Sequence, residues 1–197
     1  MNAIKSKLYI YISSLALFSV MLFLSVPQAV YAVGPLSIYT IPPCRIVDTR
    51  QAEPLWDRLG PGEVTSFYIA GGLFTFQGNF TNCNIPWPEA QGVFINIVAV
   101  NPLGNTYMIM WPADESPPTA SVINYAQVMP NLANGIFLPI CGDAGCLYED
   151  IYVYNGPAGN ADLVIDVTGF VASPAAMTAL ESSNMSSRLS KKLPEVD

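Results

Sequence analysis

The chain has 197 residues, of which 15 are Asp or Glu, 8 are Lys or Arg and none is His, for a formal net charge of −7. The absence of histidine excludes Ser-His-Asp and Cys-His catalysis and every zinc site that needs an imidazole. The acidic balance argues against nucleic acid as a partner, because such a surface repels phosphate backbones.

Residues 1–32 have the pattern of a secretory signal peptide. Two lysines precede an apolar run from Leu8 to Val26, and the segment ends on the small residue Ala32. We expect cleavage near Ala32, a secreted, extracellular or periplasmic location, and no membrane association afterwards. Because the apolar run is long, its retention as an anchor helix is the alternative.

Residues 33–172 predict one all-β domain. About eight short segments rich in β-branched and aromatic residues are separated by Gly, Pro and Asn clusters, which favours an antiparallel two-sheet β-sandwich, with jelly-roll connectivity as a compatible arrangement. The expected strands are 45–50, 64–70, 93–100, 107–111, 121–125, 135–140, 147–154 and 163–171. The third and fourth could form a hairpin across the turn at 101–105.

Residues 173–197 differ in composition, because they are rich in serine and have little to bury. We expect a flexible C-terminal tail with at most one or two helical turns over residues 175–182.

The segment Pro42 to Arg50 (PPCRIVDTR) is the most distinctive motif. In an extended strand the side chains of Asp48 and Arg50 share a face, within reach of a charge-assisted ion pair. We interpret this pair as structural and partly buried. The functional alternative is that Arg45 or Arg50 binds a carboxylate or a sugar.

Four cysteines, Cys44, Cys83, Cys141 and Cys146, predict disulfides, because an even number in an exported chain persists in the oxidised form. Three pairings are formally possible. Cys141 and Cys146 flank a Gly-containing turn and should close locally, which would leave Cys44 to join Cys83. One C-x4-C pair with two distant cysteines is poor spacing for zinc, so we predict no metal and no cofactor.

Two sets of side chains are candidates for binding or catalysis. Trp56, Trp87 and Trp111 stand beside prolines and would stack on a ligand if exposed, whereas burial at the ends of the sandwich is the alternative. A carboxylate pair for glycoside hydrolysis would have to come from acidic residues whose spacing marks no two as partners: Asp48, Glu149, Asp150, Asp162 and Asp166. We therefore predict no catalytic residue.

Several motifs along the chain occur together in one known family. They include Pro43 to Arg50, Cys83-Asn84-Ile85-Pro86, Ala120 to Tyr125 and the closing Asp166 to Phe170. With these, residues from about 41 to 171 resemble a bacterial secreted and cell-surface domain that opens with PCR-[IVL]-VDTR. The resemblance implies export, a β-rich fold and a disulfide between Cys44 and Cys83, but it implies no activity.

We therefore expect a secreted, non-catalytic structural or binding module at the bacterial cell exterior, with a role in adhesion, matrix or surface assembly. Its partners would be a second copy of itself or a cell-surface glycan or protein. The first alternative is a carbohydrate-binding module that uses Trp56, Trp87 and Trp111. The second is a carboxylate-dependent glycoside hydrolase.

Overall fold

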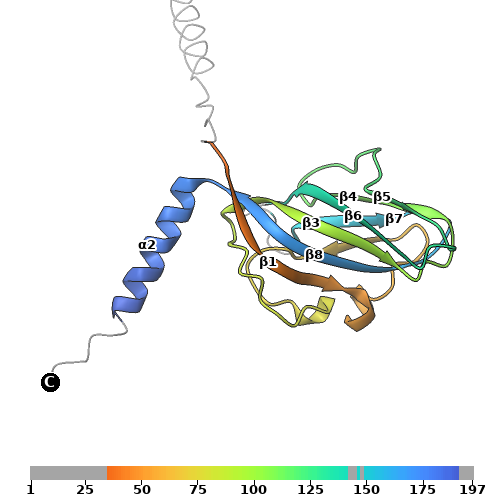
Figure 1. Cartoon of the computed structure of the whole chain (residues 1–197), viewed down its shortest axis with the longest axis horizontal. Coiled ribbons are helices and arrows are strands. Elements are labelled where there is room, and N and C mark those ends of the chain that lie inside the picture. Colours follow the sequence, from red (N-terminus) through yellow and green to blue (C-terminus); the bar gives the residue numbers. More distant parts are fainter. Residues whose placement is uncertain (1–34, 142–145, 147–148, 191–197) are drawn as a thin grey trace, which may run out of the picture. The chain divides into compact units, whose positions relative to one another are not determined.

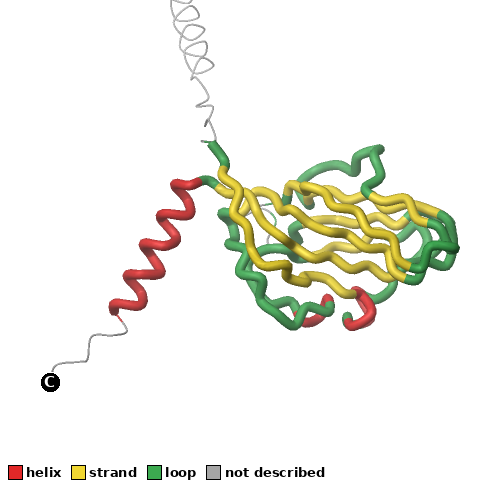
Figure 2. Tube along the Cα trace, viewed as in Figure 1, coloured by secondary structure: helices red, strands yellow, loops and turns green. Residues whose placement is uncertain are grey.

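The computed structural model describes residues 35–141, 146 and 149–190, all within a compact unit that begins at Gly34. The predicted signal peptide, residues 1–32, lies outside the described residues. The domain is an all-β sandwich of two four-stranded antiparallel sheets, as the sequence predicts (Figures 1 and 2).

Each sheet mixes strands from both halves of the domain. The first has the order β1 (Ser37–Asp48), β8 (Asp162–Ala172), β3 (Ala90–Val100) and β6 (Asn131–Pro139). The second has the order β2 (Val64–Phe67), β7 (Ile151–Asn155), β4 (Thr106–Pro112) and β5 (Ile123–Tyr125). Within the sheets β1 pairs with β8, β2 with β7, β3 with β6 and β4 with β5. This nesting is that of a long hairpin rolled into two layers, which is jelly-roll connectivity.

This connectivity contradicts the prediction that the third and fourth strands form a hairpin. β3 and β4 do not form a hairpin, because they lie in different sheets. The turn between them is fixed by two backbone hydrogen bonds, from Asn101 N–H to the Pro130 oxygen at 2.7 Å and from Leu103 N–H to the Asn160 oxygen at 2.8 Å. Asn101 adopts a positive φ of 47°, a conformation that asparagine tolerates better than most residues. These contacts lead the chain from one layer to the other.

The core lies between the layers, and β3 and β8, the two central strands of the first sheet, supply many of its residues. Their apolar residues include Ile97, Leu163 and Ile165, all fully buried. Near-continuous apolar sequence is what a strand covered on both sides requires. The two segments were for this reason the easiest to place from the sequence.

Strand ends differ from prediction where prolines or loops intervene. β1 starts at Ser37 rather than at 45, and Pro42 and Pro43 lie inside it at a register shift. Prolines are tolerated there because β1 is an edge strand. β2 ends at Phe67 and β7 begins at Ile151, each shorter than predicted. Residues 147 and 148 of the predicted strand lie outside the described residues.

One buried side chain closes the side of the sandwich where β1 and β2 form the sheet edges. Gln77, in a 3-10 turn (η3, Thr75–Gln77), is fully buried. Its Nε2 donates to the backbone oxygens of Ile46 at 2.9 Å and Tyr68 at 2.7 Å, and its Oε1 accepts from Tyr68 N–H at 3.1 Å. The side-chain amide of Gln77 thus makes hydrogen bonds with backbone groups of both edges, as a neighbouring strand would.

The C-terminal segment contains one helix, α2 (Pro174–Ser190), which is longer than the two turns expected. Pro174 opens it, a position where the missing N–H costs no helical hydrogen bond. The flexibility of residues 173–197 stays a prediction. Within the described part of the chain, no helix combines the length and hydropathy needed to cross a membrane.

Candidate functional site

The PPCRIVDTR motif surrounds a buried carboxylate. Asp48 is fully buried, and Arg50 binds it through Nε at 2.7 Å and Nη2 at 2.6 Å, so the structure contains the expected pair. Arg45 Nη1 adds a bond of 3.1 Å and Gln51 Nε2 one of 3.3 Å. Burial by itself would raise the pKa of Asp48, but the hydrogen bonds and charge of Arg50, with the charge of Arg45, outweigh it and hold that pKa below its ordinary value.

The geometry of this cluster differs from a continuous strand. β1 ends at Asp48, and residues Thr49–Gln51 form a 3-10 turn (η1) whose first N–H groups Asp48 caps by accepting from Arg50 N–H at 3.3 Å. A register shift also falls between Arg45 and Val47. In a continuous strand Arg45 and Asp48 would lie on opposite faces, but the shift and the turn bring Arg45 to the same carboxylate.

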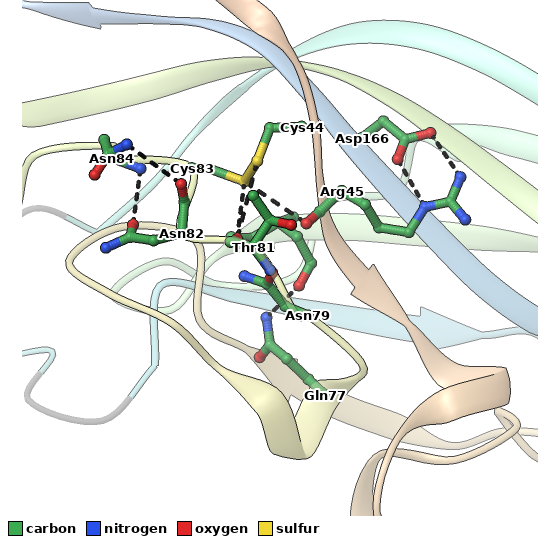
Figure 3. The surroundings of a disulfide bond; sticks show 10 residues. Cys44, Arg45, Gln77, Asn79, Thr81, Asn82, Cys83, Asn84 and Asp166 are labelled. Carbon is green, nitrogen blue, oxygen red and sulfur yellow. Dashed lines mark hydrogen bonds and ion pairs between the residues drawn. A yellow bond between two sulfur atoms is a disulfide. The ribbon is translucent and has the colours of Figure 1, made fainter.

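Arg45 also binds across the sheet. Its Nε and Nη2 contact the two carboxylate oxygens of Asp166 on β8 at 2.9 and 3.2 Å (Figure 3). Such a two-pronged contact holds the guanidinium plane in one orientation. Arg45 is therefore committed to two carboxylates of this chain, which favours the structural interpretation of the motif.

The disulfide between Cys44 and Cys83 joins β1 to the loop before β3, as the sequence predicts (Figure 3). Beside it lies an open pocket of about 370 Å³, lined by backbone and side chains of 41–45 and 81–84. Arg45 is the only charged residue of this lining, and Asp166 already binds it. The pocket has no donor or acceptor set that would define a ligand.

The second disulfide joins Cys141 to Cys146. Asp114 lies near these sulfurs, but sulfur in a disulfide is not a thiolate and does not hold a metal as one would. All four cysteines are oxidised, and the described residues include no free thiol.

The three tryptophans have different environments. Trp111 is only 7% exposed and packs beside Tyr152. Trp56 is half-buried, and its indole N–H donates to the Ser66 oxygen at 3.1 Å. Trp87 is 39% exposed. Trp111 is therefore buried and cannot stack on a ligand. Of the three tryptophans, Trp87 is the most exposed.

Trp87 belongs to a second pocket, of about 220 Å³, together with Tyr68, Phe74 and Asp150. Asp150 is 3% exposed, and burial raises its pKa, against the opposing effect of hydrogen bonds from the N–H groups of Ala70 and Ile69. Sequence reasoning listed Asp150 and Trp87 separately and did not join them, since 63 positions of chain separate them.

The remaining acidic candidates are engaged by neighbouring side chains. Arg58 binds Asp162 at 2.7 Å, and Thr49 also donates to Asp162. Asp166 binds Arg45, and Asp48 binds Arg50. Glu149 contributes a hydrogen bond to Tyr152 and raises the pKa of that tyrosine. Each of these carboxylates thus has at least one partner within the chain.

The last candidate binding surface is the outer edge of β6, where backbone N–H and C=O groups face away from the sheet. The bonds from Asn101 N–H to Pro130 and from Ile140 N–H to Gln91 fix which residues of β6 pair with β3, because bonded pairs alternate along an antiparallel ladder. Leu132, Asn134, Ile136 and Leu138 point their N–H and C=O groups toward β3. Ala133, Gly135 and Phe137 point theirs away from the sheet, and all three residues are exposed.

Comparison of the chain with protein-family models, with curated proteins and with solved structures finds no match.

Proposed function

We propose that this chain is a non-catalytic extracellular module that assembles with a second copy of itself through the outer edge of β6. Its two disulfides fit an oxidising compartment outside the cytoplasm. Export by the predicted signal peptide belongs to this proposal, as does the resemblance to bacterial cell-surface domains. The jelly roll does not carry the function, since this architecture serves many functions.

The observation that carries the proposal is the contrast between β6 and the other three sheet edges. β2 and β5 have only four and three residues, and short edges present little backbone for pairing. β1 is interrupted by Pro42 and Pro43, and Gln77 occupies the Ile46 oxygen. β6 has nine residues, with no charged side chain and with its one proline at the last position.

An antiparallel pair of β6 strands would be self-complementary. If Gly135 of one copy lies opposite Gly135 of the other, the exposed Phe137 of each lies opposite the small Ala133 of its partner. The absence of charge along β6 means that no like charges meet directly at this edge. Strand addition of this kind supplies affinity mainly through main-chain hydrogen bonds.

The test uses two substitutions at one position. Gly135→Pro removes an outward N–H without removing a bond to β3, whereas Gly135→Ala keeps that N–H. A Cβ at Gly135 meets no atom within 4 Å, so the alanine has room within the monomer, and the proline ring replaces an N–H that points away from β3. In sedimentation velocity, we expect Gly135→Ala to associate like the wild type and Gly135→Pro to associate at least about tenfold more weakly, the effect of losing about 1.4 kcal/mol. Equal association of the two variants would refute pairing through this edge.

A further inference from the structure

The pocket beside Trp87 is built from four separate segments of the chain. Tyr68, Ala70, Gly71 and Phe74 belong to the loop after β2, Trp87 precedes β3, Cys146 belongs to the second disulfide, and Asp150 precedes β7. Three aromatic rings and one carboxylate thus line a space of about 220 Å³. This volume suits a small ligand or a single head group rather than an extended chain.

The aromatic walls are held in place by contacts already described for the fold. The side chain of Gln77 accepts a hydrogen bond from the Tyr68 N–H and donates one to the Tyr68 oxygen. The Tyr68 ring stacks on Phe74 with centroids 5.0 Å apart and planes inclined by 26°. Phe76 packs edge-on against Tyr68 at 5.5 Å. Rings fixed in this way lose little further freedom when a ligand binds.

Trp87 is positioned by a glycine. Gly71 has φ +96°, and a Cβ added to it would lie 3.2 Å from the Trp87 Cβ. Gly71 N–H donates to the Ile85 oxygen at 2.9 Å, which ties this loop to the segment that carries Trp87. The indole therefore sits against backbone on one side while 39% of the residue remains exposed.

Asp150 brings a negative charge that the chain does not neutralise. Its Oδ2 accepts the N–H groups of Ile69 at 2.5 Å and Ala70 at 2.8 Å. Among the described residues, no side chain donates to Oδ1. A buried carboxylate normally has a cationic partner, because an unpaired one is costly.

The domain has no cation to spare for this role. Between residues 33 and 172 the only basic side chains are those of Arg45, Arg50 and Arg58. All three already bind carboxylates of this chain, namely Asp166 and Asp48 for Arg45, Asp48 for Arg50, and Asp162 for Arg58. The positive charge that would complement Asp150 has to come from outside the domain.

We infer that this pocket binds a small organic cation of the alkylammonium class, with its positive charge beside Asp150 and its alkyl groups against Tyr68, Phe74 and Trp87. Aromatic faces attract such cations through the ring quadrupole, and a carboxylate adds direct charge attraction. The net negative charge of the whole chain favours the approach of cations. This site is separate from β6 and does not depend on the proposed assembly.

The experiment titrates the purified, disulfide-intact protein with choline and, in parallel, with its neutral carbon isostere dimethylbutanol. Amide chemical shifts and tryptophan fluorescence report the binding. We expect choline to bind saturably with a dissociation constant on the order of 1–10 mM, as befits so small a ligand. The isostere should bind at least about tenfold more weakly, because it lacks the charge. Equal binding of the two, or no saturable binding of choline, would overturn the inference.

Two variants locate the site. Asp150→Asn keeps an oxygen for the N–H groups of Ile69 and Ala70 and removes only the charge, and we expect it to weaken choline binding at least about tenfold. Glu181→Gln, at an exposed position on α2, makes the same change in net charge and should leave binding unchanged. If Asp150→Asn fails to fold, Trp87→Leu removes the exposed ring and should also abolish binding. Choline binding that survives both site substitutions would contradict the assignment.

A pH series separates the carboxylate from a purely aromatic site. Burial raises the pKa of Asp150, so protonation of this group should weaken choline binding as the pH falls through that raised value. The other titratable groups on the segments packed around it are Tyr68, Asp114 and Glu149. The pH dependence should vanish in Asp150→Asn and persist in the control variant Glu181→Gln. A wild-type affinity that is constant between about pH 4 and pH 8 would show that Asp150 does not contact the cation.

Discussion

At the scale of single residues, the contacts of Asp48 favour a structural interpretation of the PPCRIVDTR motif. Its carboxylate is fully buried and receives bonds from Arg45, Arg50 and Gln51. All of its described donors belong to the same short segment, so the carboxylate fixes the end of β1 and the turn that follows. A catalytic carboxylate would instead need an oxygen directed toward a substrate.

Substitution of this residue should therefore affect stability. We expect Asp48→Ala to lower the free energy of unfolding by about 1–3 kcal/mol, because Arg50 loses its carboxylate partner and Arg45 loses one of its two. The measurement is urea denaturation followed by tryptophan fluorescence. Asp57→Ala, an exposed acidic residue, is the control and should change little. Comparable losses in the two variants would show that the ion pairs contribute nothing specific.

The same carboxylate predicts the direction of the pH dependence. The pKa of Asp48 is lower in the folded state than its ordinary value of 3.8. Its stabilisation is thus fully present above about pH 4 and is lost as the pH falls through the lowered folded value. The stability difference between wild type and Asp48→Asn should be constant from about pH 5 to pH 8 and should shrink below about pH 4. A difference that grows on acidification would reverse the assigned sign.

Residue spacing predicts local contacts but not distant ones. The Asp48–Arg50 pair could be read from the sequence because the two residues are neighbours, whichever backbone conformation joins them. The partner of Arg45 on β8 is 121 positions away, and only the strand order brings the two together. Asp150 and Trp87 were missed as a pair for the same reason.

At the level of elements, the two sides of the sandwich differ in how side chains join the edge strands. On the β1–β2 side, the buried amide of Gln77 joins Ile46 to Tyr68. On the side of β5 and β6, Asn134 Nδ2 donates to the Val122 oxygen at 2.7 Å. The outward backbone groups of Ala133, Gly135 and Phe137 remain available for a partner strand.

Loss of the Gln77 side chain should therefore destabilise the contact between the edges at β1 and β2. We expect Gln77→Met to lower the free energy of unfolding by about 2–4 kcal/mol, because it leaves buried N–H and C=O groups of Tyr68 and Ile46 without partners. Thermal unfolding monitored by circular dichroism measures this. The control is Gln127→Met at an exposed position. If both variants melt at the wild-type temperature, the amide does not hold this edge.

The strands that the sequence placed best are those with the simplest physical pattern. β3 and β8 are the central strands of their sheet and are rich in buried apolar residues. β1 was truncated in the prediction because Pro42 and Pro43 look like a break, although an edge strand tolerates them. The expected β3–β4 hairpin failed because a turn sequence does not reveal whether the chain returns in the same sheet or crosses to the other.

At the scale of the whole molecule, the net negative charge opposes the proposed pairing of two copies through β6. Residues 33–197 keep six of the eight basic residues and all fifteen acidic ones, which gives a net charge of −9. Two such domains repel each other at long range, and salt screens this repulsion with a Debye length of about 10 Å at 0.1 M. Pairing through the uncharged β6 should therefore strengthen between about 0.05 M and 0.5 M salt, as measured by sedimentation equilibrium. Weakening over this range would indicate ion pairs at the interface.

The central claim is that this module self-associates through a strand edge. The most direct measurement is size-exclusion chromatography with light scattering on residues 33–197, loaded over a wide series of concentrations. The account predicts a mass that rises from that of one chain toward that of two as concentration increases, with Gly135→Pro remaining at one. A constant mass of one chain at every concentration would contradict it.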